Sequence, residues 1–396
     1  MLIPILACSR QLKDEWVSRA HAACGSLFLV SDSDTFTYQG QHVVAGPFSS
    51  PERAQTYLNN GCAQVLIDFQ DADLFHEAFP RDRLVVRCYH AWQAIELFGQ
   101  GFYSHFHLAT GKSEVAVEVL TACPKLLSLS MQDDGFSPEE IGRLHKLRKD
   151  KPIHVWSNNV SHIPDAFVAC LAPSDRADGL YPTVVSDERG ICLGLVYSTK
   201  ESIHMAISRK RGIYWSRSRN EIWVKGETSG CVQQLVAITL DCDNDSLQFR
   251  VEQTGTGFCH LNTKSCFGAA RGVDHLVQTL QDRLANAPEG SYTKRLFSDA
   301  TFLRDKLVEE AAELSEAVLG VKQGTDTVYN VAAETADVLY FALTAMMAGG
   351  ANLQQVEEIL DKRALAVKRR PGNAKQQRQE EFKQFQDRKK LKEGDE

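Results

Sequence analysis

Short apolar runs alternate with helix-like patterns along the first part of the chain. The helical patterns lie at 50–59 and 137–148, and Ser50 is the expected N-cap of the first because Glu52 follows closely. This alternation predicts an α/β domain built on a parallel sheet or on part of a barrel. The runs with the length of buried strands lie at 26–30, 64–69, 84–88 and 152–156.

No catalytic constellation is evident in this α/β part. His105 and His107 alternate on one predicted strand. Two histidines without further ligands indicate polar surface or core positions, so we assign them no function.

The pattern changes twice further along the chain. It becomes mainly β, with strand-like runs at 235–240 and 247–251 around an acidic turn, and then helical. The predicted fold is therefore multidomain: an α/β domain at 1–172, a mainly-β domain at 173–270, an all-α domain at 271–368 and a charged, solvated tail at 369–396, to which we assign no function.

Three helices are expected in the all-α part. Two long apolar-periodic segments, 299–319 and 328–348, are joined by a polar loop, and a glycine pair stops the second. The third segment, 353–367, follows Asn352 as its expected N-cap.

Composition narrows the class of protein. The formal net charge of −7 argues against a nucleic-acid-binding protein, since phosphate-backbone binders usually carry a basic stripe. Eleven cysteines scattered over 396 residues are typical of reduced thiols in the cytoplasm, some of them available to metals. We see no signal peptide at 1–9 and no apolar stretch near the roughly 20 residues of a membrane span, so no membrane association is expected.

Three cysteines in the mainly-β part could bind zinc. Cys242, Cys259 and Cys266 would supply three thiolate ligands and leave the fourth position open for water, as in a catalytic site. Two alternatives stay open, namely buried free thiols and a closed structural site completed by Cys231.

Three carboxylates surround the first of these cysteines. In extended backbone, Asp241, Asp243 and Asp245 would share one face and Cys242 would point the other way. Three carboxylates repel one another unless a hard cation joins them, so Mg²⁺ is plausible. A calcium-binding helix–loop–helix is excluded because Ser246 replaces the required glycine and the flanks are strand-like. An acidic hairpin turn without a metal remains the alternative.

A second acidic group is predicted between two helices. Glu310 lies on the apolar stripe of its helix and Glu334 on that of the next, with Glu313 and Asp337 one turn further along each. Carboxylates directed into a helix interface are costly unless they are neutralised. The pattern therefore favours a divalent cation, whereas Glu316 belongs to a solvated face.

The middle part resembles the phosphoribosyl-AMP cyclohydrolase family. The matching motifs are Tyr214–Arg219, Ile222–Gly230, Asp241–Asp245 and the segment from Cys259-His260 to Ser265-Cys266-Phe267. The resemblance implies that Cys242 of one subunit joins Cys259 and Cys266 of another in binding zinc. It also implies that Asp241, Asp243 and Asp245 bind Mg²⁺ and that the protein is a homodimer.

The expected chemistry is opening of an adenine ring. In phosphoribosyl-AMP the ring is electrophilic at C6, where a zinc-activated hydroxide can attack before the N1–C6 bond opens. His260 is either the general acid or base or a hydrogen-bond partner of the ligands. Trp215 either stacks on the base or packs in the core. The residues expected to hold phosphate groups are Arg217, Arg219, Lys225, Thr228 and Ser229.

The helical part resembles phosphoribosyl-ATP pyrophosphohydrolase. The resemblance rests on Glu309-Glu310-x-x-Glu313, Glu334-x-x-Asp337, Ser291–Lys294 upstream and Val338-Leu339-Tyr340 downstream. It implies Mg²⁺ held by Glu309, Glu310, Glu313, Glu334 and Asp337, catalytic roles for Glu310 and Glu313, and a substrate contact by Lys294. Val308 stands where the family usually has glycine.

The two resemblances are consecutive steps of histidine biosynthesis, and the N-terminal extension is similar to that of fungal versions. We therefore expect a bifunctional hydrolase that releases pyrophosphate from phosphoribosyl-ATP and then opens the adenine ring of the product. The alternatives are a general nucleotide pyrophosphohydrolase with a structural zinc domain, and an inactive metal-binding scaffold.

Overall fold

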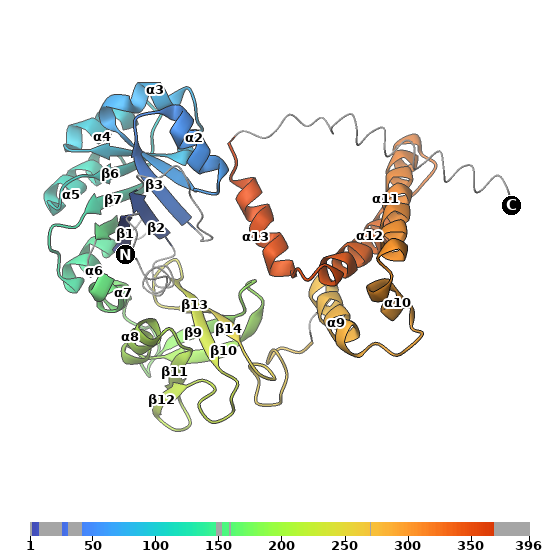
Figure 1. Cartoon of the computed structure of the whole chain (residues 1–396). Helices are drawn as coiled ribbons and strands as arrows, with labels where there is room; N and C mark the ends of the chain where they lie inside the picture. Colours follow the sequence, from blue (N-terminus) through green and yellow to red (C-terminus); the bar gives the residue numbers. More distant parts are fainter. Residues whose placement is uncertain are drawn as a thin grey trace.

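The computed structural model describes residues 2–7, 26–30, 42–147, 153–157, 160–269 and 271–367. Three successive parts follow one another along the chain, namely a barrel, a mixed sheet and a group of helices (Figure 1). The predicted tail at 369–396 lies outside the described residues.

The N-terminal part is a closed barrel of parallel strands. Each strand pairs with the next in sequence, and the eighth pairs with the first, so that the sheet has no free edge. The prediction of a parallel α/β domain is confirmed, and the barrel is complete rather than partial. The strands are β1 Leu2–Ala7, β2 Ser26–Val30, β3 His42–Phe48, β4 Gln64–Asp68, β5 Leu84–Cys88, β6 His105–Leu108, β7 Ser128–Gln132 and β8 Ile153–Ser157.

Helices follow the strands from β3 onward and cover the barrel (Figure 1). Ser50 caps the first as predicted, since its side chain accepts a hydrogen bond from the Arg53 backbone N–H. The helices are α2 Pro51–Asn59, α3 Ala72–His76, α4 Ala91–Gly99, α5 Ser113–Ala122, α6 Pro138–Lys146 and α7 Ile163–Cys170, with short 3₁₀ turns at Phe69–Asp71, Arg81–Arg83 and Val160–His162.

The interior of the barrel is partly polar. His107 is buried, its ring stacks on Trp156 at 3.9 Å between centroids, and its Nδ1 lies 3.0 Å from the Ser130 hydroxyl. Burial lowers the pKa of His107 to about 3, so this histidine is neutral at pH 7. His105 lies 2.7 Å from the Ser128 hydroxyl. His107 is therefore a core residue of the barrel, whereas His105 is half-buried.

The middle part is a six-stranded sheet in the order β12-β11-β10-β9-β14-β13. All neighbouring strands are antiparallel except β14 and β9. One continuous cluster of buried apolar side chains runs from the barrel into this sheet. The elements are β9 Tyr181–Ser186, β10 Cys192–Ser198, α8 Lys200–Arg209, β11 Ile213–Ser216, β12 Glu221–Val224, β13 Gln233–Leu240 and β14 Leu247–Gln253.

The last part is helical, as predicted, and its two long helices pack against each other. α12 has the length and composition of a membrane span, contrary to the expectation that no apolar stretch reaches that length. It carries Glu334 and Asp337 and packs on α9 and α11, which places it within this group of helices. The helices are α9 Gly272–Asn286, α10 Tyr292–Ser298, α11 Ala300–Gln323, α12 Val328–Ala348 and α13 Leu353–Ala364.

The last helix returns to the barrel (Figure 1). Arg83 Nη1 donates to the Leu365 carbonyl at 2.6 Å, and the Val367 N–H donates to Asn59 Oδ1 at 3.1 Å. Val367 also packs against the apolar cluster of the barrel. The segment that follows α13 therefore contacts the N-terminal barrel.

Candidate functional site

The three aspartates of the middle part meet at the turn between β13 and β14. One carboxylate oxygen each of Asp241, Asp243 and Asp245 lies within 4.8 Å of the others. The backbone is a turn, not the extended segment assumed from the sequence, because Asp241 Oδ1 accepts the N–H groups of Asp245 and Ser246, both at 3.1 Å. The flanking strands agree with the exclusion of a helix–loop–helix calcium site.

Electrostatics of this turn favour a cation. A hydrogen bond with Asp241, followed by repulsion from the Asp241 and Asp245 carboxylates, raises the pKa of Asp243. A bound hard cation would relieve that repulsion, and oxygen donors of this kind are the ligands Mg²⁺ prefers. The residues present therefore fit the predicted metal.

Two of the three predicted zinc ligands lie together in one loop. The cysteine loop, which we define as residues 258–266, is closed by Phe258 N–H to Lys264 C=O at 3.2 Å and Cys259 N–H to Thr263 C=O at 3.1 Å. The Leu261 N–H, then the Thr263 hydroxyl and the neighbouring Cys266 thiol, lower the pKa of Cys259. Desolvation and then Cys259 raise the pKa of Cys266. Two neighbouring thiols of this kind suit a soft cation.

The neighbours of the thiol pair include one predicted residue and one that the sequence did not suggest. His260 is exposed, and its Nδ1 lies 3.9 Å from Cys259 Sγ. Cys192, at the start of β10, is close enough to contribute to the raised pKa of Cys266. Cys192 lies far from this loop in sequence, so spacing gave no signal for it.

Cys242 is exposed in the aspartate turn. Among the described residues, groups of three or more potential ligands form at Asp241–Asp245 and at Glu310, Glu313 and Glu334, and the three cysteines of one chain form no such group. Cys231 hydrogen-bonds to the Thr256 hydroxyl at 3.4 Å.

Two predicted substrate residues line a surface pocket of about 530 Å³. Trp215 and Arg217 line it together with Tyr197 and Trp223, so Trp215 faces the pocket rather than the core. The Arg217 guanidinium lies 3.9 Å from the centroid of the Tyr197 ring, and this cation–π contact holds the charged group beside the pocket. Tyr197 was not predicted, because an aromatic residue on a strand carries no distinctive pattern.

The other basic and polar residues differ in their surroundings. Lys225 is buried, with its Nζ 5.3 Å from the Phe258 ring centroid at the base of the cysteine loop. Arg219 is exposed and pairs with Glu221 at 3.1 Å, and the structure does not place it in the pocket. Thr228 and Ser229 lie in an exposed turn, where Ser229 Oγ accepts the Cys231 N–H at 3.3 Å.

The second acidic group lies between α11 and α12. Oxygens of Glu310, Glu313 and Glu334 lie within 4.8 Å of one another, and Glu310 is buried. Lys306, one turn earlier, lies 3.2 Å from Glu310 and 2.9 Å from Glu309, and these bonds raise the pKa of Lys306. A divalent cation fits three convergent carboxylates of which one is buried.

The remaining predicted residues of this site lie outside the group of three. Glu309 is directed to Lys306, and Asp337 is exposed on α12. Lys294 forms an ion pair with Glu289 at the start of α10. Val308 lies within an uninterrupted α11, so the departure from glycine leaves the helix intact.

Family models match both the middle part and the helical part of the chain. The family model for phosphoribosyl-AMP cyclohydrolase matches residues 194–268, and the model for phosphoribosyl-ATP pyrophosphohydrolase matches residues 273–364.

Three relatives show how far the similarity extends. The histidine biosynthesis trifunctional protein of Kluyveromyces lactis is 45% identical over 251 residues, which are 63% of this chain and 30% of the relative. That of Saccharomyces cerevisiae is 39% identical over 337 residues, 84% of this chain and 35% of the relative, so the similarity reaches into the barrel. The chain thus spans about a third of these relatives.

A bacterial relative is matched over most of its own length. The histidine biosynthesis bifunctional protein HisIE of Deinococcus radiodurans is 35% identical over 198 residues, which are 47% of this chain and 88% of the relative. This chain therefore belongs to the family of histidine-biosynthesis proteins that join a phosphoribosyl-AMP cyclohydrolase region to a phosphoribosyl-ATP pyrophosphohydrolase region, in the fungal form with an N-terminal extension.

Proposed function

We propose that this chain catalyses two successive hydrolytic steps on phosphoribosyl nucleotides. The observation that carries the proposal is the convergence of carboxylates at two separate places, the aspartate turn and the α11–α12 interface. Each place lies within, or directly beside, a region that matches one of the two hydrolase families. We propose domain limits at 172, 270 and 368, with the reaction taking place in the cytoplasm.

The first step would occur between α11 and α12. Water attacks a phosphorus atom of the phosphoribosyl-ATP triphosphate, and the products are phosphoribosyl-AMP and pyrophosphate. Glu310, Glu313 and Glu334 would hold Mg²⁺, which when bound neutralises phosphate charge. We assign Glu309 and Asp337 to the same metal site. Lys294 would contact the phosphates.

The second step would occur beside the cysteine loop. Water adds at C6 of the adenine ring and the N1–C6 bond breaks. Zinc held by Cys242, Cys259 and Cys266 supplies water activation when bound. His260 is exposed 3.9 Å from the Cys259 sulfur and would move a proton to or from the ring. Asp241, Asp243 and Asp245 would hold Mg²⁺, which when bound would neutralise phosphate charge.

Substrate binding would use the pocket beside β10 and β11. Trp215 would stack on the adenine, and Arg217, held over Tyr197, would receive the phosphate. Buried Lys225 beside Phe258 would connect this pocket with the cysteine loop. Arg219, Thr228 and Ser229 would contribute further phosphate contacts from exposed positions.

The zinc site would require a homodimer. In one chain the exposed Cys242 forms no ligand group with Cys259 and Cys266. A second copy could bring its Cys242 to the cysteine loop of the first, which is the shared arrangement that the family resemblance implies.

The test is incubation with phosphoribosyl-ATP, Mg²⁺ and Zn²⁺ while pyrophosphate and the ultraviolet spectrum are followed. We expect pyrophosphate release and then a spectral change that depends on Zn²⁺. Release of pyrophosphate from common nucleoside triphosphates at the same rate would favour a general pyrophosphohydrolase. Absence of both reactions in the folded, metal-loaded protein would favour a binding scaffold.

A further inference from the structure

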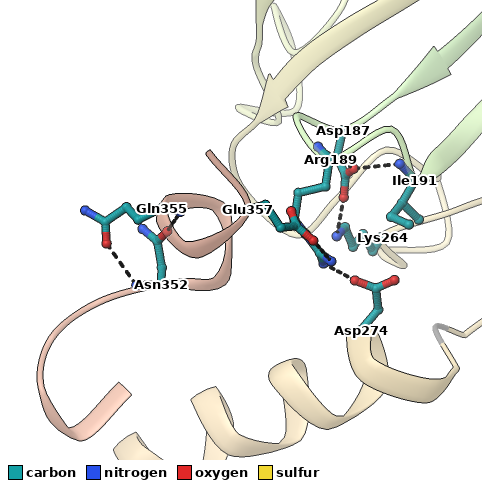
Figure 2. Close-up of polar contacts among 8 residues, drawn as sticks. All are labelled: Asp187, Arg189, Ile191, Lys264, Asp274, Asn352, Gln355 and Glu357. Atoms are coloured by element: carbon teal, nitrogen blue, oxygen red, sulfur yellow. Dashed lines mark hydrogen bonds and ion pairs between the residues drawn. The ribbon is translucent and has the colours of Figure 1, made fainter. Parts of the chain in front are cut away.

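A single arginine in the β9–β10 turn fastens the sheet to the helical part (Figure 2). Arg189 donates through Nε to Glu357 Oε2 at 2.7 Å and through Nη2 to Oε1 at 2.6 Å, and its Nη1 pairs with Asp274. The three side chains are mostly shielded from water, with exposed fractions of 21%, 37% and 20% for Arg189, Glu357 and Asp274. Bidentate pairing in such surroundings is directional and persistent.

The two acidic partners come from the first and last helices of the helical part. Asp274 lies in the first turn of α9, and Glu357 lies on α13. The start of α13 is itself fixed, because Asn352 Oδ1 accepts the Gln355 N–H at 2.9 Å and Gln355 Oε1 accepts the Asn352 N–H at 3.0 Å (Figure 2). Arg189 thus holds two helices that are far apart in sequence.

The same turn also reaches the cysteine loop (Figure 2). Asp187 is almost fully buried, and its Oδ1 accepts the N–H groups of Arg189 at 3.2 Å and Ile191 at 2.8 Å. Its Oδ2 pairs with Lys264 Nζ at 2.6 Å. The backbone of Lys264 in turn accepts the Phe258 N–H that closes the loop. A buried carboxylate held by two amides and a lysine leaves the turn little freedom.

We propose that residues 187–191 form a coupling turn, in which Arg189 transmits the position of α9 and α13 to the cysteine loop through Asp187 and Lys264. Domains in one chain usually move relative to each other unless a specific interface restrains them. Arg189 is in this sense a positioning residue for the loop. That the loop belongs to a hydrolytic site rests on the proposed function; the mechanical connection does not.

The test compares two neighbouring glutamates of α13 in the full chain. Glu357→Gln removes the bidentate partner of Arg189, whereas Glu358→Gln changes a residue that accepts a hydrogen bond from Gln354 on the same helix. Hydrogen–deuterium exchange is followed in the peptide that contains residues 258–266. We expect exchange there to become about tenfold faster in Glu357→Gln and to stay unchanged in Glu358→Gln.

Arg189 variants complete the test. Arg189→Met also loses the pair with Asp274, so it should accelerate exchange at least as much as Glu357→Gln. Adding Glu357→Gln to Arg189→Met should change little, because the bidentate pair is already gone. Arg189→Lys should restore part of the protection, since it keeps the charge but loses the bidentate geometry. If Arg189 variants do not fold, the glutamate pair still decides the question.

The outcome that overturns the proposal is unchanged exchange at 258–266 in a folded Glu357→Gln protein. Equal acceleration in Glu358→Gln, or in the β13–β14 strands as well, would indicate general loosening and would also overturn it. Hydrogen–deuterium exchange is measured without any catalytic reaction. A chain with the expected exchange pattern but no hydrolysis would therefore refute the proposed function alone.

Discussion

At the scale of single residues, Glu310 and Cys259 are the side chains on which the two proposed reactions depend most directly. Each is buried beside an exposed or half-buried partner ligand, Glu313 for the first and Cys266 for the second. They lie on different parts of the chain, one in α11 and one in the cysteine loop. Their roles can therefore be tested independently.

We predict that Glu310→Gln stops pyrophosphate release and leaves ring opening of added phosphoribosyl-AMP nearly intact, because only one metal site loses a charge. Cys259→Ala should do the reverse. The rates of the two reactions are measured separately, and each loss should exceed about a hundredfold. Loss of both activities in either folded variant contradicts the two-site proposal.

A further prediction concerns His107 in the barrel. Its folded-state pKa of about 3 lies below the ordinary value of 6.5, so the unfolded chain binds a proton that the folded chain excludes. The free energy of unfolding should therefore fall as the pH drops from about 6.5 towards 3. One such group contributes about 2 kcal/mol between pH 7.5 and pH 5.

Urea unfolding at pH 7.5 and pH 5 measures this effect. His107→Gln should lower the stability at pH 7.5, because it loses the stacking on Trp156, but should weaken the pH dependence. His145, whose pKa burial also lowers to about 3, would account for part of the acid sensitivity that remains. An unchanged difference between the two pH values would refute the assignment.

At the scale of elements, local sequence signals predicted the helix caps, but they did not predict that the barrel closes. Ser50 and Asn352 cap the expected helices because capping needs only neighbours within one turn. β7 was not predicted because its polar residues leave no continuous apolar run. Leu129 and Met131 are nevertheless buried, and Ser130 bonds to His107 inside the barrel. Pairing of β8 with β1 joins distant residues, which periodicity cannot reveal.

The candidate sites show the same division. Spacing on a helix brought out Glu310, Glu313 and Glu334, since the 3.6-residue repeat fixes which side chains share a face. It could not show that Lys306 would draw Glu309 aside. Arg189 and Tyr197 were missed because their partners come from other elements.

The contact between the barrel and the sheet should contribute to the stability of the sheet. α7 packs against α8, and the Ala172 N–H donates to the Asn244 carbonyl beside the aspartate turn. A fragment that starts at Ala172 should retain some ring-opening activity, because the proposed site residues all follow it. It should nevertheless be less soluble and melt at a lower temperature, since the cut exposes apolar surface of α8.

The comparison is between fragments starting at Ala172 and at Val160, the second of which keeps α7. We expect the longer fragment to melt higher, measured by calorimetry at equal zinc. A soluble, dimeric fragment from Ala172 with no ring-opening activity would show that the barrel contributes to the reaction itself.

At the scale of the whole molecule, the shared zinc site predicts complementation between inactive chains. When present alone, the Cys242→Ala protein should have no ring-opening activity, and the same holds for the Cys266→Ala protein. In a mixed dimer one site has lost both ligands and the other has all three, so up to half of the sites should recover. The measurement is ring opening after subunit exchange, with chelation expected to loosen the dimer. Confirmed mixed dimers without recovery would place all zinc ligands within one chain.

The return of α13 to the barrel has a consequence for how the chain is made. The bonds from Arg83 to Leu365 and from Val367 to Asn59 join residues 282 and 308 positions apart. During synthesis the barrel leaves the ribosome long before its partner helix exists, and domains generally fold in order of emergence. Docking of α13 then follows folding of the barrel. It can occur only in chains that have been translated through residue 367, so the barrel has to fold first without this contact.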